Sequence, residues 1–115
     1  FPAPAVLKPT MNWIRIASAH DLQDDEVLGL TVDGARIALY RSEGAFFATD
    51  NRCTHAEAQM SDGYLEDGCI ECPLHQARFD IRTGKALCAP ATEDLRTHAV
   101  RREGDDIYIA DPAAP

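Results

Sequence analysis

The chain lacks any apolar run approaching the about 18 residues that a transmembrane helix needs, and no secretory signal pattern precedes its first polar segment. It also lacks an excess of positive charge, because 11 Lys and Arg face 19 Asp and Glu, giving a net charge of −8. Nucleic acids and anionic membrane surfaces would repel such a chain, so neither is an expected partner. At 115 residues it has no length for a second core. These absences favour one small soluble domain in the cytoplasm.

Long helical periodicity and internal repeats are absent as well. In their place stand short runs rich in β-branched and aromatic residues, separated by turn residues. Asp33-Gly34 and Glu103-Gly104-Asp105 are hairpin signals between pairs of such runs. Ser18 followed by Asp21 resembles a capping box that opens one short helical turn. The predicted strands are residues 12–16, 27–32, 35–40, 45–49, 97–102 and 106–110. The expected fold class is all-β, built of small antiparallel sheets with a loop-built subdomain over residues 51–90.

The two ends of the chain differ from this pattern. Residues 1–10 are rich in Pro and Ala and lack periodicity, and Met11 follows them. We expect residues 1–10 to be a leader or an added extension, and residues 111–115 to be a frayed tail. The folded domain is therefore predicted over residues 11–110.

Two short motifs carry the metal chemistry. Cys53-Thr54-His55 and Cys72-Pro73-Leu74-His75 each present one sulfur and one nitrogen, with sixteen residues between His55 and Cys72. A structural zinc site usually takes two cysteines from one loop and a second pair from the other. Here each loop carries one cysteine and one histidine, so the two cysteines can bind one metal and the two histidines another. This is the ligation of a Rieske [2Fe-2S] centre. A zinc-stabilised interaction module is the alternative reading.

The chain resembles Rieske-type ferredoxins, and in particular the ferredoxin components of bacterial aromatic-ring-hydroxylating dioxygenase systems of the naphthalene-dioxygenase kind. The resemblance rests on residues 53–55, 72–80 and 83–90, and it extends from about Met11 to about Ala110. It implies a Rieske fold of three stacked antiparallel sheets, with the loops that bind the cluster at one end. It also implies one [2Fe-2S] cluster per chain, with Cys53, His55, Cys72 and His75 as the cofactor-binding metal ligands.

The resemblance further implies an electron carrier in aromatic hydrocarbon catabolism. An NAD(P)H-dependent flavoprotein, the ferredoxin reductase, would reduce it, and a terminal Rieske oxygenase would receive the electron. The chain itself is not expected to be an enzyme. An oxygenase needs a mononuclear iron held by two histidines and a carboxylate, and only His20 and His98 lie outside the motifs. The alternative is a fixed small Rieske subunit of another redox enzyme, such as a nitrite-reductase-like assembly.

The same resemblance predicts a low reduction potential. High-potential Rieske proteins add a disulfide between the two loops, and Ala58 and Leu74 stand at those positions here. They also add a serine and a tyrosine hydroxyl near cluster sulfur, where this chain has Ala77 and Phe79. Without hydroxyl donors, the negative charge of an added electron is less stabilised, so the potential should stay low.

Four further residues could bind metal but are assigned structural roles. Cys69 and Cys88 are interpreted as small buried apolar residues. His20 and His98 fall on a predicted helical turn and a terminal strand, and both are interpreted as surface or packing residues.

Overall fold

The computed structural model describes residues 12–54, 58–74, 76–88 and 93–111. Strands dominate these ranges, so the predicted all-β class is confirmed. The elements are β1 (Trp13–Ser18), η2 (Ala19–Asp21), β2 (Glu26–Val32), β3 (Ala35–Ser42), β4 (Ala45–Asp50), η3 (Met60–Asp62), β5 (Tyr64–Glu66), β6 (Cys69–Glu71), β7 (Arg78–Asp80), β8 (Thr97–His98), β9 (Val100–Glu103) and β10 (Asp106–Ala110). No helix in the described ranges is long and apolar enough to cross a membrane.

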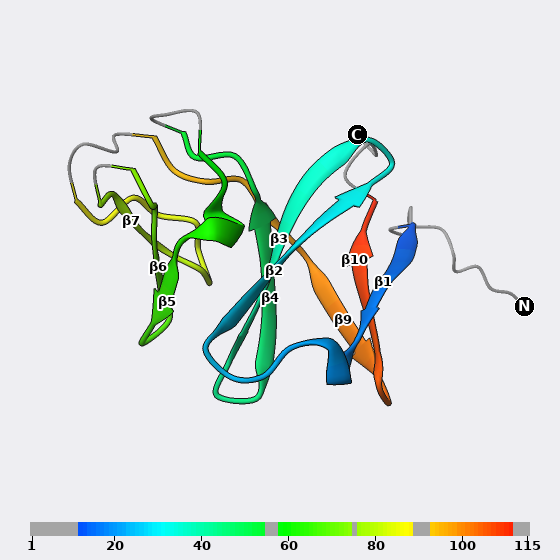
Figure 1. The fold of residues 1–115 in the computed structure, drawn as a ribbon. Coiled ribbons are helices and arrows are strands. Elements are labelled where there is room, and N and C mark those ends of the chain that lie inside the picture. The colour runs from blue at the N-terminus through cyan, green and yellow to red at the C-terminus, as the bar shows by residue number, and fades with distance from the viewer. Residues whose placement is uncertain (1–11, 55–57, 75, 89–92, 112–115) are drawn as a thin grey trace, which may run out of the picture.

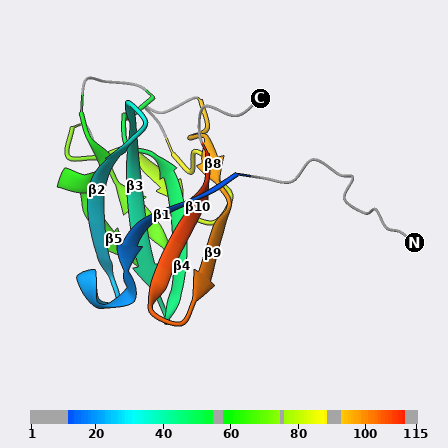
Figure 2. The ribbon, with the colours of Figure 1, turned by 90° about the vertical axis from the view of Figure 1, so that its right-hand side faces the viewer.

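The strands form three antiparallel sheets, as predicted (Figure 1). The terminal sheet has the order β1-β10-β9, the middle sheet β2-β3-β4-β8, and the small sheet β5-β6-β7. In Figure 1 the middle sheet stands between the other two, and Figure 2 shows the terminal sheet in front of it. The small sheet and its loops therefore occupy one end of the molecule.

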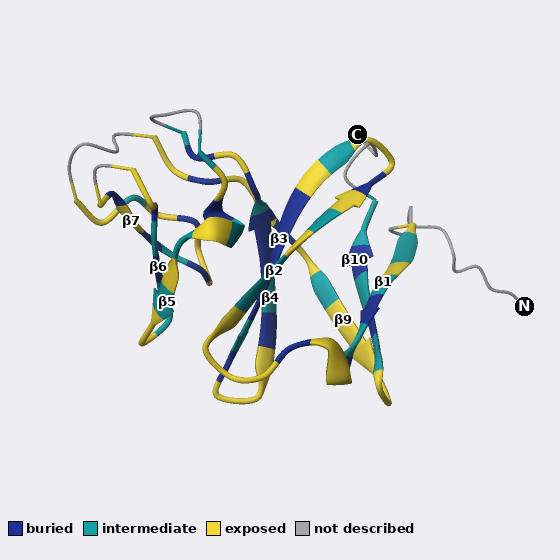
Figure 3. Ribbon diagram, viewed as in Figure 1, coloured by how far each residue is buried: buried dark blue, intermediate teal, exposed yellow. Residues whose placement is uncertain are grey.

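Strand β3 runs through the centre of the fold and is buried on both faces (Figure 3). Successive side chains of a strand point to opposite faces. Ile37 and Leu39 accordingly pack into a core shared with the terminal sheet, whereas Ala38 and Tyr40 pack into a core shared with the small sheet. All four residues have no exposed surface. One strand thus joins the two cores and fixes the small sheet against the rest of the domain.

The hairpin predicted at Asp33-Gly34 is present between β2 and β3. Its two central residues have φ angles of 50° and 83°. A two-residue turn that matches the right-handed twist of its strands needs positive φ at both positions, which Asp tolerates and Gly adopts without strain. The turn places Val32 opposite Ala35 and sets the register of the whole pair.

The predicted strand over residues 97–102 is wrong in its continuity. Thr97 and His98 pair with β4 in the middle sheet, while Val100 begins β9, which pairs with β10 in the terminal sheet. The chain changes sheets at Ala99. No Gly, Pro, Asn or Asp interrupts this run. Its division therefore depends on partner strands that are distant in sequence.

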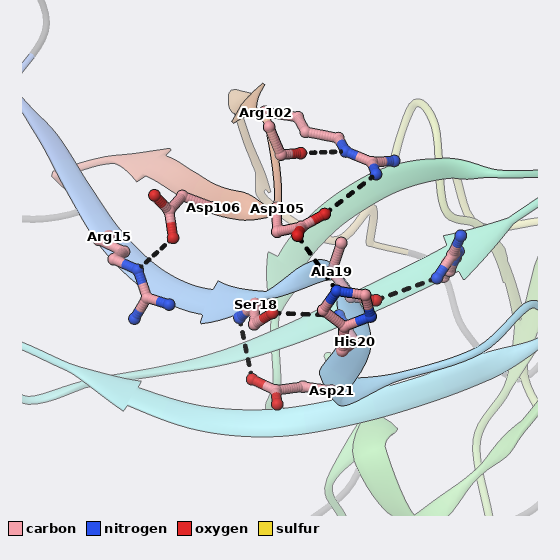
Figure 4. Close-up of polar contacts among 10 residues, drawn as sticks. Arg15, Ser18, Ala19, His20, Asp21, Arg102, Asp105 and Asp106 are labelled. Carbon is pink, nitrogen blue, oxygen red and sulfur yellow. Dashed lines mark hydrogen bonds and ion pairs between the residues drawn. The ribbon is translucent and has the colours of Figure 1, made fainter.

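The capping box predicted at Ser18 is confirmed (Figure 4). The Ser18 hydroxyl accepts a hydrogen bond from the His20 amide at 3.2 Å, and the Asp21 carboxylate accepts one from the Ser18 amide at 2.9 Å. His20 is exposed and lies 3.1 Å from Asp105 in the β9–β10 turn. The contact between His20 and Asp105 connects the end of β1 to the β9–β10 turn of the terminal sheet, at a distance from the small sheet.

Candidate metal centre

The first motif lies in a six-residue loop over residues 53–58, which we call the first loop. It follows β4 and precedes η3. An isolated antiparallel bridge joins Arg52 to Gln59 on either side of it. Inside this bridge, the Cys53 amide donates to the Ala58 carbonyl at 2.9 Å. The first loop is therefore a hairpin loop that begins at a cysteine.

The second motif lies in a loop of the same length over residues 72–77, the second loop. Strands β6 and β7 flank it, and Glu71 pairs with Arg78 at its base. The Cys72 amide donates to the Ala77 carbonyl at 2.7 Å. The two motifs thus occupy hairpin loops with the same closing hydrogen bond, and each cysteine is the first residue of its loop.

The structure brings the two motif cysteines together in the core next to the small sheet. Cys53 is 2% exposed and Cys72 is 1% exposed, and neither is in a disulfide. The Leu74 amide donates to the Cys72 Sγ at 3.4 Å. Burial raises the pKa of the Cys72 thiol, the Leu74 amide opposes this rise, and the Cys53 side chain adds to it. The two cysteine side chains therefore lie close enough to interact across the loops.

This pair of sulfurs fits an iron–sulfur centre. Burial disfavours a thiolate unless a cation lies beside it, and a metal ion supplies that positive charge. Thiolate sulfur is also the soft ligand that iron–sulfur clusters require. An amide that donates to Sγ stabilises the same negative charge from the protein side. The donor set therefore fits a bound metal ion, which would supply the positive charge that two buried thiolates need.

The two motif histidines, His55 and His75, lie outside the described residues. They are the third residue of the first loop and the fourth residue of the second. Among the residues that the structure describes, no group of three or more His, Cys, Asp or Glu could hold a metal ion. The complete ligand set of two cysteines and two histidines accordingly stays a prediction.

The positions where hydroxyl groups are missing lie beside the second loop. Ala77 ends this loop and Phe79 lies on β7, and neither has exposed surface. Both belong to the same core cluster as Cys53 and Cys72. High-potential Rieske proteins have hydroxyl groups at these two positions, whereas this chain has buried apolar side chains there. The low reduction potential stays a prediction, and these two residues are where it can be tested.

The interpretation of Cys69 and Cys88 needs correction. Cys69 is only partly buried, and Cys88 is exposed, with its Sγ 3.9 Å from the Gln76 carbonyl of the second loop. The sequence around a cysteine that belongs to no ligand motif does not indicate whether its side chain is buried or exposed. His98 is the packing residue it was expected to be, because it is 8% exposed and its Nε2 lies 2.7 Å from an Asp50 carboxylate oxygen.

Comparison with known proteins identifies the class to which this arrangement belongs. The family model described as Rieske [2Fe-2S] domain matches residues 12–99. The chain therefore belongs to the Rieske [2Fe-2S] family, and its cofactor is a [2Fe-2S] cluster.

Individual relatives narrow the class to ferredoxins. The chain is 55% identical over 100 residues to the ferredoxin component of the naphthalene 1,2-dioxygenase system of Pseudomonas putida, covering 87% of this chain and 96% of that protein. It superposes with a TM-score of 0.83 and 32% identity on a chain in a complex of reduced oxygenase and oxidised ferredoxin of carbazole 1,9a-dioxygenase, covering 89% and 95% of the two chains. The prediction of a Rieske ferredoxin is confirmed.

A third structure bears on the alternative function. A putative nitrite reductase small subunit superposes with a TM-score of 0.76 over 86% of this chain and 98% of that chain, but at 20% identity. Likeness at that level shows a shared fold and no more. The identity to the ferredoxin component of the naphthalene dioxygenase system is much higher, at 55%. It therefore favours an electron-carrying ferredoxin over a fixed subunit of another enzyme.

Adding hydroxyl groups beside the second loop should raise the reduction potential. The variant is Ala77→Ser combined with Phe79→Tyr, two positions buried in the core that holds both cysteines. Hydroxyl donors near sulfur stabilise the charge of the added electron. Redox titration followed by visible absorbance measures the shift. Phe79→Leu, which alters packing and adds no donor, is the control. An unchanged potential in the double variant, at full iron and sulfide content, would contradict the prediction.

Proposed function

We propose that this chain is a diffusing electron-transfer ferredoxin that carries one electron at a time within an aromatic-ring-hydroxylating dioxygenase system. Cys53 and Cys72 would bind one iron as thiolates, and His55 and His75 would bind the other as neutral imidazoles. A bound [2Fe-2S] cluster supplies reversible one-electron chemistry. The chain's own residues hold it at one end of the domain, exclude water from its sulfur ligands, and set its potential.

One observation supports this proposal most directly. Two hairpin loops of equal length present their leading cysteines to the same buried position, where the side chains interact. Each loop also carries one histidine, so neither loop can hold the cluster alone. The identity of 55% with a ferredoxin component of a naphthalene dioxygenase system supports the same assignment.

The electron count defines the partners. NAD(P)H gives up two electrons as a hydride, and a flavin can accept them together and release them singly. An NAD(P)H-dependent flavoprotein reductase is therefore the proposed donor, and each NAD(P)H would reduce two molecules of this chain. The proposed acceptor is a terminal Rieske oxygenase that selects the aromatic substrate. The cytoplasm is the proposed location, because that compartment supplies NAD(P)H and keeps thiols reduced.

The end of the domain that bears the two loops is the proposed docking face. Leu74 in the second loop is 42% exposed, and Leu87 is 47% exposed. The Leu87 amide donates to the Arg78 carbonyl at 2.8 Å, which places this residue alongside the strand that leaves the second loop. Exposed leucines beside a redox centre suit a transient contact with a partner. The net charge of −8 would speed encounter with basic surfaces.

Reconstitution tests the proposal. Purified protein is mixed with a flavoprotein reductase and a terminal oxygenase of a naphthalene dioxygenase system, and NADH-driven product formation is followed. We expect turnover that depends on this chain, saturates with its concentration and slows as salt rises, since salt screens charge beyond about 8 Å at physiological ionic strength. Stable co-purification with a redox enzyme, together with no support of oxygenase turnover, would favour the fixed subunit instead.

A further inference from the structure

Asn51 is a buried polar residue at the entrance to the first loop, and the proposed function assigns it no role. It follows directly after β4 and is 2% exposed. Its Oδ1 accepts a hydrogen bond from the Ser61 amide at 2.8 Å, and its Nδ2 donates to Gln59 Oε1 at 3.1 Å and to Ser61 Oγ at 3.0 Å. We call Asn51, Gln59 and Ser61 the Asn51 network. It joins the chain entering the first loop to the chain leaving it.

The backbone of Asn51 extends this connection to the middle sheet. Its amide donates to the Arg36 carbonyl of β3 at 3.0 Å, and its carbonyl accepts from the Met60 amide at 2.7 Å. One residue therefore fixes both arms of the first loop to the central strand of the domain. Satisfied polar networks of this kind define position sharply, because each unpaired buried group would cost free energy.

The two loops differ in how their bases are held. Below the second loop, β6 and β7 form a ladder of three residue pairs, and β5 extends that sheet. Below the first loop, the described residues form no strand ladder: the isolated bridge between Arg52 and Gln59 is followed by one backbone hydrogen bond, from the Met60 amide to the Asn51 carbonyl. The side chain of Asn51 adds further hydrogen bonds across the base of the first loop, where the second loop has a strand ladder.

Strand β2 lies against this network at Gly29. A Cβ atom added at Gly29 would lie 2.7 Å from Ser61 Oγ and 3.1 Å from Asn51 Nδ2. Contacts that short force a neighbouring atom to move, and the first affected is the Ser61 hydroxyl. The absence of a side chain at Gly29 thus permits β2 to pack directly against the network.

We infer that Asn51 is a positioning residue for the metal centre, which holds the first loop in the orientation that its ligands need. The inference rests on the proposed ligand set, because the first loop carries Cys53 and His55. Replacing a residue that orients a metal ligand without binding the metal commonly lowers metal affinity by about 10- to 100-fold. Loss of the Asn51 side chain would leave the Ser61 amide without its acceptor and loosen both arms of the loop.

The test compares cluster release from the holoprotein of wild type and Asn51→Ala. Release is followed as loss of visible absorbance in the presence of an iron chelator, and we expect it to be about tenfold faster or more in the variant. The electron paramagnetic resonance spectrum of the reduced protein should also shift or broaden, because the ligand geometry varies. Amide exchange at Cys53 and Met60 should increase while exchange in the terminal sheet stays unchanged.

A stability-matched control separates positioning from general destabilisation. Ile109 is fully buried in the core shared by the terminal and middle sheets. An Ile109 variant, to valine or alanine, is chosen to match the Tm of Asn51→Ala. At equal Tm, only the Asn51 variant should release its cluster faster and show an altered resonance spectrum.

Gly29→Ala tests the same network from the other side and leaves Asn51 in place. This variant should also release the cluster faster than wild type, and its effect should be smaller in the Asn51→Ala background because the network is already broken.

If Asn51→Ala does not fold, Gly29→Ala and Ser61→Ala provide the test. Release at the rate of the Ile109 control, with an unchanged spectrum, would overturn the inference and leave the proposed function intact. Wild-type protein without iron and sulfide would overturn both.

Discussion

Cys72→Ser is expected to yield protein that has lost the [2Fe-2S] cluster or retains it only weakly, and Cys53→Ser should do the same. Both thiols are buried and interact with each other, so each change replaces a soft sulfur donor by a hard hydroxyl inside the site. Serine at either position would also bury a hydroxyl in an apolar core. Iron and acid-labile sulfide content per chain, measured on freshly purified protein, gives the result.

The chain provides matched controls for this experiment. Cys69 is partly buried on β6, and Cys88 is exposed beside the second loop. Cys69→Ser and Cys88→Ser make the same chemical change outside the proposed ligand set, so both should keep full iron and sulfide content. A cluster that survives intact in Cys72→Ser, or one that disappears in Cys88→Ser, would contradict the ligand assignment.

Replacing His55 and His75 together by cysteine should produce the largest change in potential. Neutral imidazole leaves its iron more positive than thiolate does, so mixed ligation eases reduction. The potential is expected to fall from about −150 mV toward the all-cysteine value of about −400 mV. For one electron this difference is roughly 6 kcal/mol, since 59 mV corresponds to a tenfold change in the equilibrium constant. The variant would be too reducing for an NADH-linked reductase to load well.

Redox titration of the double variant provides the measurement, and iron and sulfide analysis confirms that a cluster is present. Replacement of the two remaining histidines, by His20→Gln and His98→Gln, is the matched control and should leave the potential near that of wild type. His98 contacts Asp50 and His20 contacts Asp105, so neither side chain is assigned to the site. A wild-type potential well above 0 mV would contradict the low-potential assignment.

Local chemistry made much of the fold predictable from sequence. The Asp33-Gly34 turn, the strand-forming run that becomes β3 and the capping box at Ser18 each depend on residues close together in the chain. The sheet change at Ala99 was not predictable, because it depends on whether β4 or β10 lies alongside. The three-residue strands β5, β6 and β7 are likewise too short to display an alternating pattern.

Part of the candidate site was predictable from the sequence, and part was not. The spacing of cysteine and histidine predicted two loops, and the structure shows that these loops share one length and one closing hydrogen bond. Nothing in the sequence pointed to Asn51, because a single asparagine after a strand looks like an ordinary turn residue. Its role emerges only from contacts with Gln59 and Ser61, which belong to the far side of the first loop.

Metal and sulfide analysis of the wild-type protein tests the central claim most directly. Protein expressed with ample iron and purified without oxidation is assayed for iron, acid-labile sulfide and zinc. The account predicts about two irons and two sulfides per chain, with little zinc and a red-brown colour. One equivalent of zinc with no labile sulfide, in colourless protein, would contradict the assignment of a Rieske electron carrier.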